Sequence, residues 1–393
     1  MKTVLLRAPV LTCSGYGVHA RQIAKWLFEL EETLDLDITV EALNWGHTGW
    51  LTDIEAEDGL VGRVLQASEN IKPFYDVTIQ LQLPNEWNPM LGSFNVGITA
   101  GVEADRCNPL WVDAVNQMNL VIVPSEFTKQ CFLNSGKVNT DIVVVPESFI
   151  DELKNPEECS INLDLPTNFN FLLFGQITGN NPENDRKNLP YTLKWLAEAL
   201  AGRPDVGIIL KSNLVRNTKI DRDACTNMFN KLVSEIKIGP GPQFYLLHGN
   251  MTNKEVVGLY THPKIKALVS LTHGEGYGLP ILEAAVAGLP VIVPGWSGHM
   301  EFLKHGKFSK VEHKVAPVHE SRVDGQIFVQ GAQWVYPNEH DAKRRILKFV
   351  ESPGVPREWA KELRTKLLST YSSEAVGAEY TRILRPLLEE SNS

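Results

Sequence analysis

Residues 273–293 read HGEGYGLPILEAAVAGLPVIV. This segment carries two glutamates eight positions apart, Glu275 in a glycine-rich loop and Glu283 in the first turn of a predicted helix. The apolar run at residues 267–271 predicts a buried strand before the loop, and residues 291–293 predict the next strand. A strand, a loop, a helix and a strand in this order predict a parallel sheet with a right-handed crossover.

The residue types in this segment mark the limits of the helix. Gly274, Gly276 and Gly278 allow the backbone to take positive φ or to approach a ligand closely. Pro280 suits the first helical position, where no N–H is needed. Gly288 suits the position just past the helix end. The N-terminal end of such a helix is a natural phosphate site.

The two acids indicate what else binds there. Carboxylates beside a phosphate are electrostatically unfavourable, so Glu275 and Glu283 are expected to face hydroxyl groups. A nucleotide sugar supplies both a diphosphate for the loop and sugar hydroxyls for the acids. An ordinary helix N-terminus with favourable acids is the alternative. It leaves the coincidence of glycine loop, spacing and proline unexplained.

Residues 275–283 resemble the E-x7-E signature of retaining GT-B glycosyltransferases of the family 4 type. The resemblance implies that Glu283 holds the donor ribose and that Glu275 lies near the transferred sugar. It also implies backbone contacts to the sugar and phosphate from Gly276, Tyr277, Gly278 and Leu279. The match is specific in this loop and extends more weakly over most of the chain.

A basic pair precedes another predicted helix. Arg186 and Lys187 come just before Asn188, a predicted N-cap, so they are expected beside a positive helix end, where they can neutralise a diphosphate leaving group. They resemble the R-K-G/N element of the same family, although the family's usual arginine after the first strand of this domain is absent at residues 175–177. Lys211, after the apolar run 206–210, is a second diphosphate candidate. Two solvated charges in a loop are the alternative for Arg186 and Lys187, and a plain edge lysine is the alternative for Lys211.

The first half of the chain offers weaker candidates. Gly15 and Gly17 follow the first predicted strand and resemble the family's N-terminal glycine loop, which lies under the donor phosphates and the acceptor. Glu103 or Asp105 stands where many family members place a histidine near the reacting sugar, and either could position an acceptor hydroxyl or act as a base. An acidic loop without a catalytic role is the alternative. His299 is expected to lie near the nucleotide.

No metal is expected. The ten histidines form no H-E-x-x-H pattern, and no Cys/His spacing fits zinc. Asp35 and Asp37 mimic a D-x-D metal motif, but a turn between a helix and a strand explains them. The only cofactor-like molecule expected is therefore the co-substrate, a UDP- or GDP-linked sugar.

Composition limits the classes of function. The net charge of −9 argues against a general nucleic-acid coat and against firm attachment to anionic lipid. Five scattered cysteines without a C-x-x-C pair favour a reduced, cytoplasmic location. The N-terminal apolar run is too short for a signal peptide, and no stretch approaches the ~20 apolar residues of a membrane helix.

The length of 393 residues predicts two domains. Alternating strands and helices predict doubly wound α/β sheets. With the resemblance, the expected fold class is GT-B: two facing Rossmann-like domains, at residues 1–160 and 165–370. The resemblance also implies that a C-terminal helix, predicted at residues 372–390, crosses back to the first domain. The ligand site is expected in the cleft between the two sheets, outside the carboxyl ends of their strands.

The predicted activity is metal-independent transfer of a sugar from a nucleoside diphosphate to a hydroxyl acceptor, with retained anomeric configuration. Same-face attack and double displacement both remain open. A glycan or glycoside is the expected acceptor, and a modified base in DNA is the less favoured alternative. A nucleotide-sugar epimerase, a donor hydrolase and a non-catalytic nucleotide-sugar binder are the other functions considered.

Overall fold

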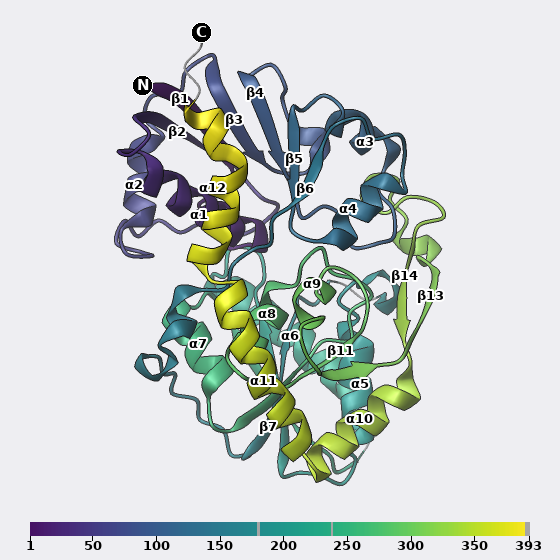
Figure 1. The fold of residues 1–393 in the computed structure, drawn as a ribbon. Coiled ribbons are helices and arrows are strands. Elements are labelled where there is room, and N and C mark those ends of the chain that lie inside the picture. The colour runs from purple at the N-terminus through teal and green to yellow at the C-terminus, as the bar shows by residue number, and fades with distance from the viewer. Residues whose placement is uncertain (179–180, 237–238, 390–393) are drawn as a thin grey trace. The chain divides into compact units, whose positions relative to one another are not determined.

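The chain forms two compact units in a computed structural model that describes residues 1–178, 181–236 and 239–389. Unit 1 comprises residues 1–148 together with those from Tyr371 onward, and unit 2 comprises Phe149–Thr370. Each unit is built on a six-stranded parallel sheet (Figure 1). The α/β, doubly wound prediction is therefore confirmed.

The sheet of unit 1 has the strand order β2-β1-β3-β4-β5-β6. Val4 of β1 pairs with Ile38 of β2 on one side and with Val77 of β3 on the other. The chain runs from β1 to β2 on one side and then to β3 on the other, so the strand order reverses at β1. The carboxyl end of β1 is therefore a topological switch point, where ligands bind in open α/β sheets. The strands are β1 Lys2–Ala8, β2 Leu36–Ala42, β3 Tyr75–Leu81, β4 Gly92–Ile98, β5 Leu120–Val123 and β6 Ile142–Val144.

Three helices of unit 1, α1, α3 and α4, begin at polar capping residues. Ser14 caps α1 by accepting from Gly17 N, and Asn108 and Ser125 cap α3 and α4 in the same way. The cap predicted at Ser125 is thus confirmed, since its hydroxyl accepts from Thr128 N. The helices are α1 Gly15–Leu30, α2 Leu60–Ala67, α3 Pro109–Val115, α4 Glu126–Leu133 and α12 Ser373–Glu389, with a 3-10 turn η1 at Pro84–Glu86.

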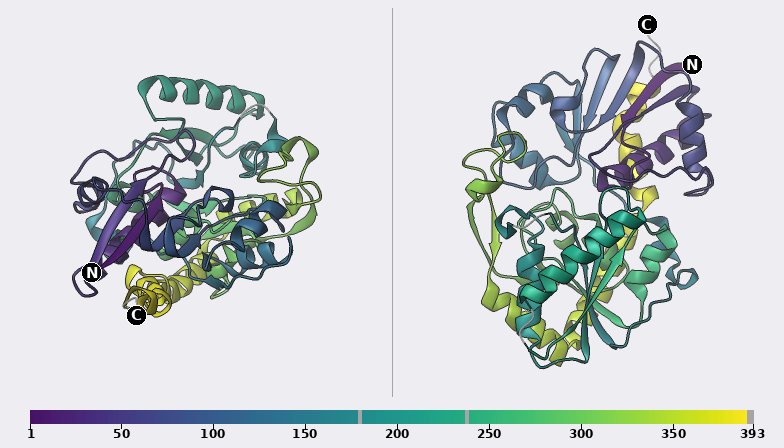
Figure 2. Two further views of the ribbon diagram at one scale, coloured as in Figure 1. Left: turned by 90° about the horizontal axis from the view of Figure 1, so that it is seen from above. Right: turned by 180° about the vertical axis from the view of Figure 1, so that it is seen from behind.

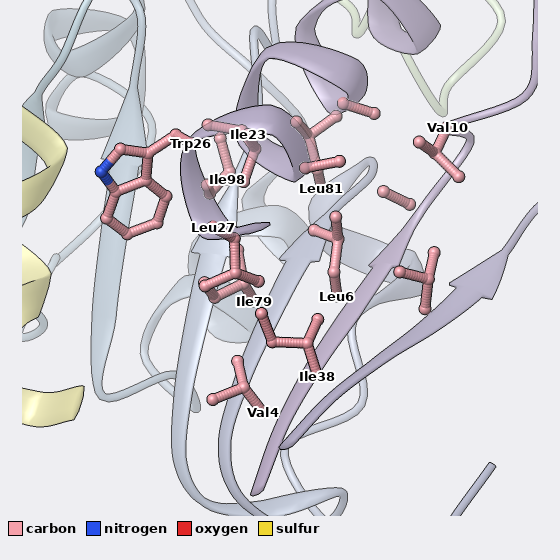
Figure 3. Close-up of a cluster of buried hydrophobic side chains, with 14 of the residues drawn as sticks. Val4, Leu6, Val10, Ile23, Trp26, Leu27, Ile38, Ile79, Leu81 and Ile98 are labelled. Atoms are coloured by element: carbon pink, nitrogen blue, oxygen red, sulfur yellow. The ribbon is translucent and has the colours of Figure 1, made fainter. Parts of the chain in front are cut away.

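The core of unit 1 forms where α1 lies on the sheet. Ile23, Trp26 and Leu27 recur at helical spacing on α1 and meet strand residues such as Leu6 and Ile79 (Figure 3). Leu6, Leu27 and Ile79 are fully buried. Each such side chain contributes roughly 1.5–3 kcal/mol relative to exposure.

The C-terminal helix α12 belongs to unit 1 although it follows unit 2 in sequence. Val376, Tyr380, Leu384 and Leu388 form one apolar stripe and join the core cluster of α1. The indole N–H of Trp26 donates to Thr381 Oγ1 at 2.9 Å. The prediction that the last helix returns to the first domain is confirmed.

The sheet of unit 2 has the strand order β12-β11-β10-β7-β8-β9. Phe171 of β7 lies between Ile208 of β8 and Ala267 of β10. Its strands are β7 Phe169–Phe174, β8 Val206–Ser212, β9 Gln243–His248, β10 Ile265–Val269, β11 Val291–Pro294 and β12 Ser309–Val311. An antiparallel hairpin, β13 His313–Pro317 and β14 Gln333–Pro337, stands apart from this sheet.

Helices pack against the second sheet through apolar faces. Leu193 and Leu196 of α5, Phe229 of α6 and Ile346 of α10 share one buried cluster with the strands, and α6 crosses the sheet in the view from behind (Figure 2). The helices are α5 Leu189–Ala199, α6 Lys219–Ile236, α7 Asn253–Thr261, α8 Leu279–Val286, α9 Met300–Leu303, α10 Glu339–Glu351 and α11 Gly354–Thr370. Short 3-10 turns are η2 Asp151–Lys154, η3 Pro156–Glu158, η4 Pro182–Asn184 and η5 Glu320–Arg322.

The described residues also show the state of the cysteines and the apolarity of the helices. All five cysteines lie among the described residues and are free thiols. In the parts of the chain that the structure describes, no helix combines the length and apolarity that a bilayer crossing requires.

Candidate active site

The glycine loop leads from β10 into α8. Gly278 is the N-cap of α8 with φ +98°, a conformation that glycine takes without strain, and Gly288 with φ +78° follows the helix end as predicted. Two details differ from the prediction. The helix begins at Leu279, so Pro280 is its second residue. Glu283 is its fifth residue and therefore lies in the second turn of the helix, not in the first.

The basic turn before α5 is held by Asp185. One of its carboxylate oxygens accepts from Lys187 N at 2.9 Å, and the other accepts from Leu189 N at 2.7 Å. Asn188 stands at the predicted N-cap position of α5, but its side chain does not cap the helix: its φ is left-handed at +54°, and its amide donates to Leu271 O at 2.9 Å. Asn188 instead ties the turn to the segment after β10.

Glu275 lies at the centre of an ion cluster with this turn. Lys187 Nζ is 2.7 Å from Glu275 Oε1 and 2.8 Å from Oε2, and Arg186 Nη1 is 3.0 Å from Oε2. Arg186 Nη1 also donates to Gly274 O at 2.6 Å. The structure therefore brings three of the predicted residues together from segments almost ninety positions apart.

The carboxylate of this cluster is buried, whereas its two cations are partly exposed. The Glu275 side chain is only 6% exposed, whereas those of Arg186 and Lys187 are 22% and 28% exposed. Burial opposes ionisation of Glu275, but the charges of Lys187 and Arg186 outweigh it and lower its pKa to about 2. Glu275 is therefore an ionised carboxylate over the whole physiological pH range.

A shallow surface hollow opens beside this cluster, with ≈ 250 Å³ of space when the open solvent at its mouth is included. Its lining includes Lys187, Glu275 and Gly278, with Phe174 and Ile281 as apolar walls. Of the described residues, neither Glu283 nor Lys211 lines it. A hollow of similar volume near Leu289 and Leu363 has a mainly apolar lining and lacks this convergence of charges. The hollow beside Glu275 is the better candidate for a ligand.

His273 anchors the loop to the β13–β14 hairpin, which the sequence analysis did not identify as part of the site. Its Nδ1 lies 2.6 Å from Val335 O, its ring stacks on Trp334 with centroids 4.5 Å apart, and its backbone N donates to Arg186 O at 2.9 Å. The hairpin thus supports the loop from one side and the basic turn contacts it from the other. The contact joins His273 to Val335, 62 positions away in sequence, so no local pattern could reveal it.

Glu283 has a different environment from Glu275. It is 7% exposed, and its Oε2 accepts a hydrogen bond from Tyr260 OH at 3.0 Å. Burial raises the pKa of Glu283 to about 7, and the charge of Glu152 also raises it, while the Tyr260 hydrogen bond opposes the shift. The two glutamates of the motif therefore differ in charge state near neutral pH.

This raised pKa predicts a pH-dependent effect of Glu283→Gln. The folded state holds the proton more tightly than the unfolded state, whose pKa is near 4.5. The resulting stabilisation is complete below about pH 4.5 and is lost as pH rises through about 7. Glutamine avoids this loss, so at pH 8 the variant is expected to be more stable than wild type by up to about 3 kcal/mol. Thermal unfolding at pH 5 and pH 8 tests this, and an equal difference at both values would contradict it.

Lys211 lies inside β8, since the strand continues through Ser212. It is buried, and its Nζ donates to Asn213 Oδ1 at 2.7 Å and to Gly249 O at 2.6 Å. Its contacts join the loops that follow β8 and β9. A role toward a diphosphate remains a prediction for this residue.

The candidates of unit 1 lie in two segments that meet through Tyr16: Gly15 and Gly17 fall in the first turn of α1 rather than in the predicted loop, and Glu103 follows β4. Its hydroxyl lies 3.0 Å from Thr99 Oγ1 and accepts from Gly101 N at 3.0 Å. This contact joins the first turn of α1, with Gly15 and Gly17, to the loop that carries Glu103. Gly17 cannot carry a side chain, because a Cβ there would lie 2.0 Å from Thr12 O. The catalytic role of Glu103 stays a prediction.

No group of three or more His, Cys, Asp or Glu residues that could hold a metal occurs within residues 1–178, 181–236 and 239–389. Arg186 and Lys187 of the ion cluster are partly exposed cations that a bound anion can meet. Asp35, from the D-x-D mimic, pairs instead with the N-terminal amine at 2.8 Å.

Comparison with known proteins supports the sequence resemblance. Residues 264–375 match the family described as "Family 4 Glycosyltransferase in conflict systems", which covers less than a third of the chain and includes the loop of Glu275 and Glu283. No curated protein matches the chain.

Solved structures with the same fold are glycosyltransferases of the GT-B type. HepE of Anabaena, in complex with UDP and glucose, aligns with a TM-score of 0.61 at 14% identity over 98% of this chain and 100% of its own. Sucrose-phosphate synthase of Thermosynechococcus elongatus gives 0.62 at 14% identity over the whole of both chains. An E. coli structure described as trehalose-6-phosphate bound with UDP-2-fluoro glucose gives 0.59 at 9% identity, also over both whole chains. The predicted GT-B fold and the resemblance to family 4 are confirmed.

Proposed function

We propose that this chain, a GT-B protein of the family 4 glycosyltransferase type, is a retaining glycosyltransferase. It transfers a sugar from a nucleoside diphosphate to a hydroxyl acceptor. The single observation that carries the proposal is the buried, ionised Glu275 held by Lys187 and Arg186 beside an open hollow. A buried carboxylate with two cations is a costly arrangement for stability alone, and such perturbed groups concentrate at functional sites.

The charges of the cluster suit the departure of a diphosphate. Lys187 and Arg186 are partly exposed, so an anion can reach them while they remain in contact with Glu275. The N-terminal turn of α8 adds the positive end of a helix at Gly278, which also lines the hollow. In this proposal, both cations stabilise the negative charge that develops on the leaving group, without a metal ion.

The carboxylate of Glu275 would act on the other side of the breaking bond. The anomeric carbon becomes positively charged as the bond to the diphosphate lengthens, and an ionised carboxylate nearby stabilises that charge. Because the pKa of Glu275 is lowered to about 2, it keeps its negative charge throughout the reaction. Glu275 would also accept hydrogen bonds from the hydroxyls of the transferred sugar.

Glu283 would bind the donor ribose through hydrogen bonds from its hydroxyls. Tyr260 already occupies one of its carboxylate oxygens, which fixes the orientation of the group. Ribose hydroxyls would replace part of the solvation that Glu283 loses on burial. Binding would therefore favour its ionised form and strengthen as pH rises through about 7.

A uridine nucleotide is the first donor to test, because HepE was crystallised with UDP and glucose and the E. coli structure holds UDP-2-fluoro glucose. A thermal-shift screen would compare UDP- and GDP-linked sugars with free UDP, GDP and hexose 1-phosphates. A donor at 100 times its Kd adds about 2.7 kcal/mol of stability and should raise the melting temperature by several degrees. If no nucleotide sugar shifts the melting temperature, the proposal fails.

Acceptor trials with the best donor then test transfer. A hydroxyl glycoside or glycan is the expected acceptor, and the anomeric configuration of the product, read by NMR, should match that of the donor. Donor consumption without an acceptor would identify a hydrolase instead, and tight binding without turnover a silent binder. Transfer to DNA carrying a modified base, with a steep salt dependence, would identify a DNA-modifying enzyme.

A further inference from the structure

Ser297 has a backbone conformation that is costly for its residue type. It follows β11 in the segment Gly295-Trp296-Ser297-Gly298-His299 and takes a φ of +79°, in the left-handed region that favours glycine. It is also buried, with 3% of its surface exposed. Strained residues of this kind persist where the surrounding structure requires them and are concentrated at functional sites.

The strained residue holds the backbone of Glu275. The Ser297 hydroxyl oxygen accepts a hydrogen bond from Glu275 N at 2.9 Å. The next residue, Gly298, donates its N–H to Glu275 O at 2.9 Å. Both backbone polar groups of the central carboxylate residue are thus bound by two consecutive residues of another loop.

The close approach of the two loops depends on Gly298. A Cβ at this position would lie 1.9 Å from Gly276 O and 2.8 Å from Glu275 O. A side chain there is impossible unless the backbone moves. The left-handed turn at Ser297 therefore brings Gly298 against the glycine loop, where only glycine fits.

His299 orients the serine hydroxyl. Its Nε2 lies 2.7 Å from Pro294 O, a carbonyl that can only accept, so Nε2 carries the proton. Its Nδ1 is then an acceptor and lies 3.4 Å from Ser297 Oγ. Burial lowers the pKa of His299, which keeps the ring neutral. The hydroxyl of Ser297 therefore points its hydrogen toward His299 and its lone pairs toward Glu275 N.

We infer that Ser297 is a positioning residue whose hydroxyl holds the backbone of Glu275, so that the carboxylate stays aligned with Lys187 and with the reacting sugar. This inference rests on the proposed function for the reaction itself. A glycine at position 297 would give the same turn without strain but would leave Glu275 N without its acceptor. Serine is thus present because of its hydroxyl and in spite of its backbone cost.

The test compares Ser297→Gly with Ser297→Ala. Both variants remove the hydroxyl, but only glycine relieves the backbone strain, so Ser297→Gly should melt about 2–4 °C above Ser297→Ala. If the hydroxyl positions Glu275, both variants should lose turnover by roughly tenfold, the effect of one lost hydrogen bond to a buried amide. The donor KM should stay within about twofold, because the alignment matters mainly in the transition state.

A purely structural role predicts a different pattern. Ser297→Gly would then keep the turnover of wild type, because it is the more stable variant, and this result would overturn the inference. Asp58→Gly is the matched control: Asp58 is exposed in unit 1 with φ +56°, and its replacement should leave turnover unchanged. If the control loses as much turnover as the Ser297 variants, the inference is also overturned.

Hydrogen exchange of the Glu275 amide separates this inference from the proposed function. In both Ser297 variants the amide should exchange roughly tenfold faster, since its acceptor is gone. This measurement needs no substrate. A wild-type protein that transfers no sugar would contradict the proposed function, whereas unchanged protection of the Glu275 amide would contradict the positioning role of Ser297.

Discussion

Replacing Glu275 by glutamine is expected to lower turnover by roughly 10²–10³-fold, the effect of removing one preorganised charge or dipole at a reacting centre. The amide has nearly the same shape but no negative charge to offset the positive charge at the anomeric carbon. It also cannot accept hydrogen bonds with both of its terminal atoms, as the carboxylate does from Lys187 and Arg186. Single-turnover rates at saturating donor would measure the loss.

The stability of Glu275→Gln should change little. The variant loses two ion pairs, but the burial of a charged carboxylate is relieved at the same time. Lys187 and Arg186 are partly exposed, so water can solvate them once the carboxylate is gone. A melting temperature near that of wild type together with a large loss of turnover would therefore assign Glu275 to chemistry. Turnover at the wild-type rate would remove Glu275 from the mechanism.

Replacing Lys187 by alanine is expected to lower turnover to a similar degree and to destabilise the protein as well. Lys187→Ala lowers stability more than Glu275→Gln because Glu275 is buried. Of the two cations that bind its carboxylate, Arg186 alone would remain. Leaving a buried charge short of a partner costs up to about 3–5 kcal/mol, and the remaining Arg186 contact reduces that cost. The measurements are thermal unfolding and single-turnover kinetics with the best donor.

The dependence of turnover on pH gives an independent measure of the interaction between Lys187 and Glu275. With Lys187 removed, the largest favourable charge on Glu275 is lost, so the pKa of Glu275 should rise from its value of about 2. Because the ionised form is the active one, the acidic limb of the turnover profile should move to higher pH. A profile identical to that of wild type would show that Lys187 does not control Glu275.

The double variant Glu275→Gln with Lys187→Ala separates stability from chemistry. It should melt above Lys187→Ala, because no buried carboxylate is left to desolvate, yet it should remain inactive. Lys194→Ala is a suitable control, since Lys194 lies on α5 with a side chain 47% exposed and pairs only weakly with Glu198 at 3.9 Å. A double variant less stable than Lys187→Ala would contradict the explanation given for the cluster.

Much of the fold could be predicted because the dominant signals are local. Apolar runs such as residues 206–210 can be satisfied only in a sheet covered on both faces, and they were placed correctly. Gly288 also marked the C-terminal end of α8 correctly. The N-cap position of α5 was predicted correctly at Asn188, but Asp185 supplies the side-chain acceptor, because the Asn188 amide is bound to Leu271 O.

The sequence identified most residues of the site but not the contacts between them. Spacing and residue type pointed to Glu275, Glu283, Lys187 and Arg186. Nothing in the sequence indicated that Lys187 would bind Glu275, or that Tyr260 would bind Glu283. Ser297 left only a faint signal, a small polar residue beside a glycine in the loop after a predicted strand.

The sequence by itself determined the two α/β units, the strand–loop–helix that carries both glutamates, and the sign of the charges beside it. Those properties depend on side-chain polarity and backbone preference over a few residues. Only the tertiary structure decided that Glu275 is ionised with a pKa near 2 while the pKa of Glu283 lies near 7. Both groups are glutamate side chains with the same ordinary pKa of 4.5. They differ because the turn before α5 brings two cations to the carboxylate of Glu275, whereas that of Glu283 is buried and, among the described residues, accepts its hydrogen bond from Tyr260.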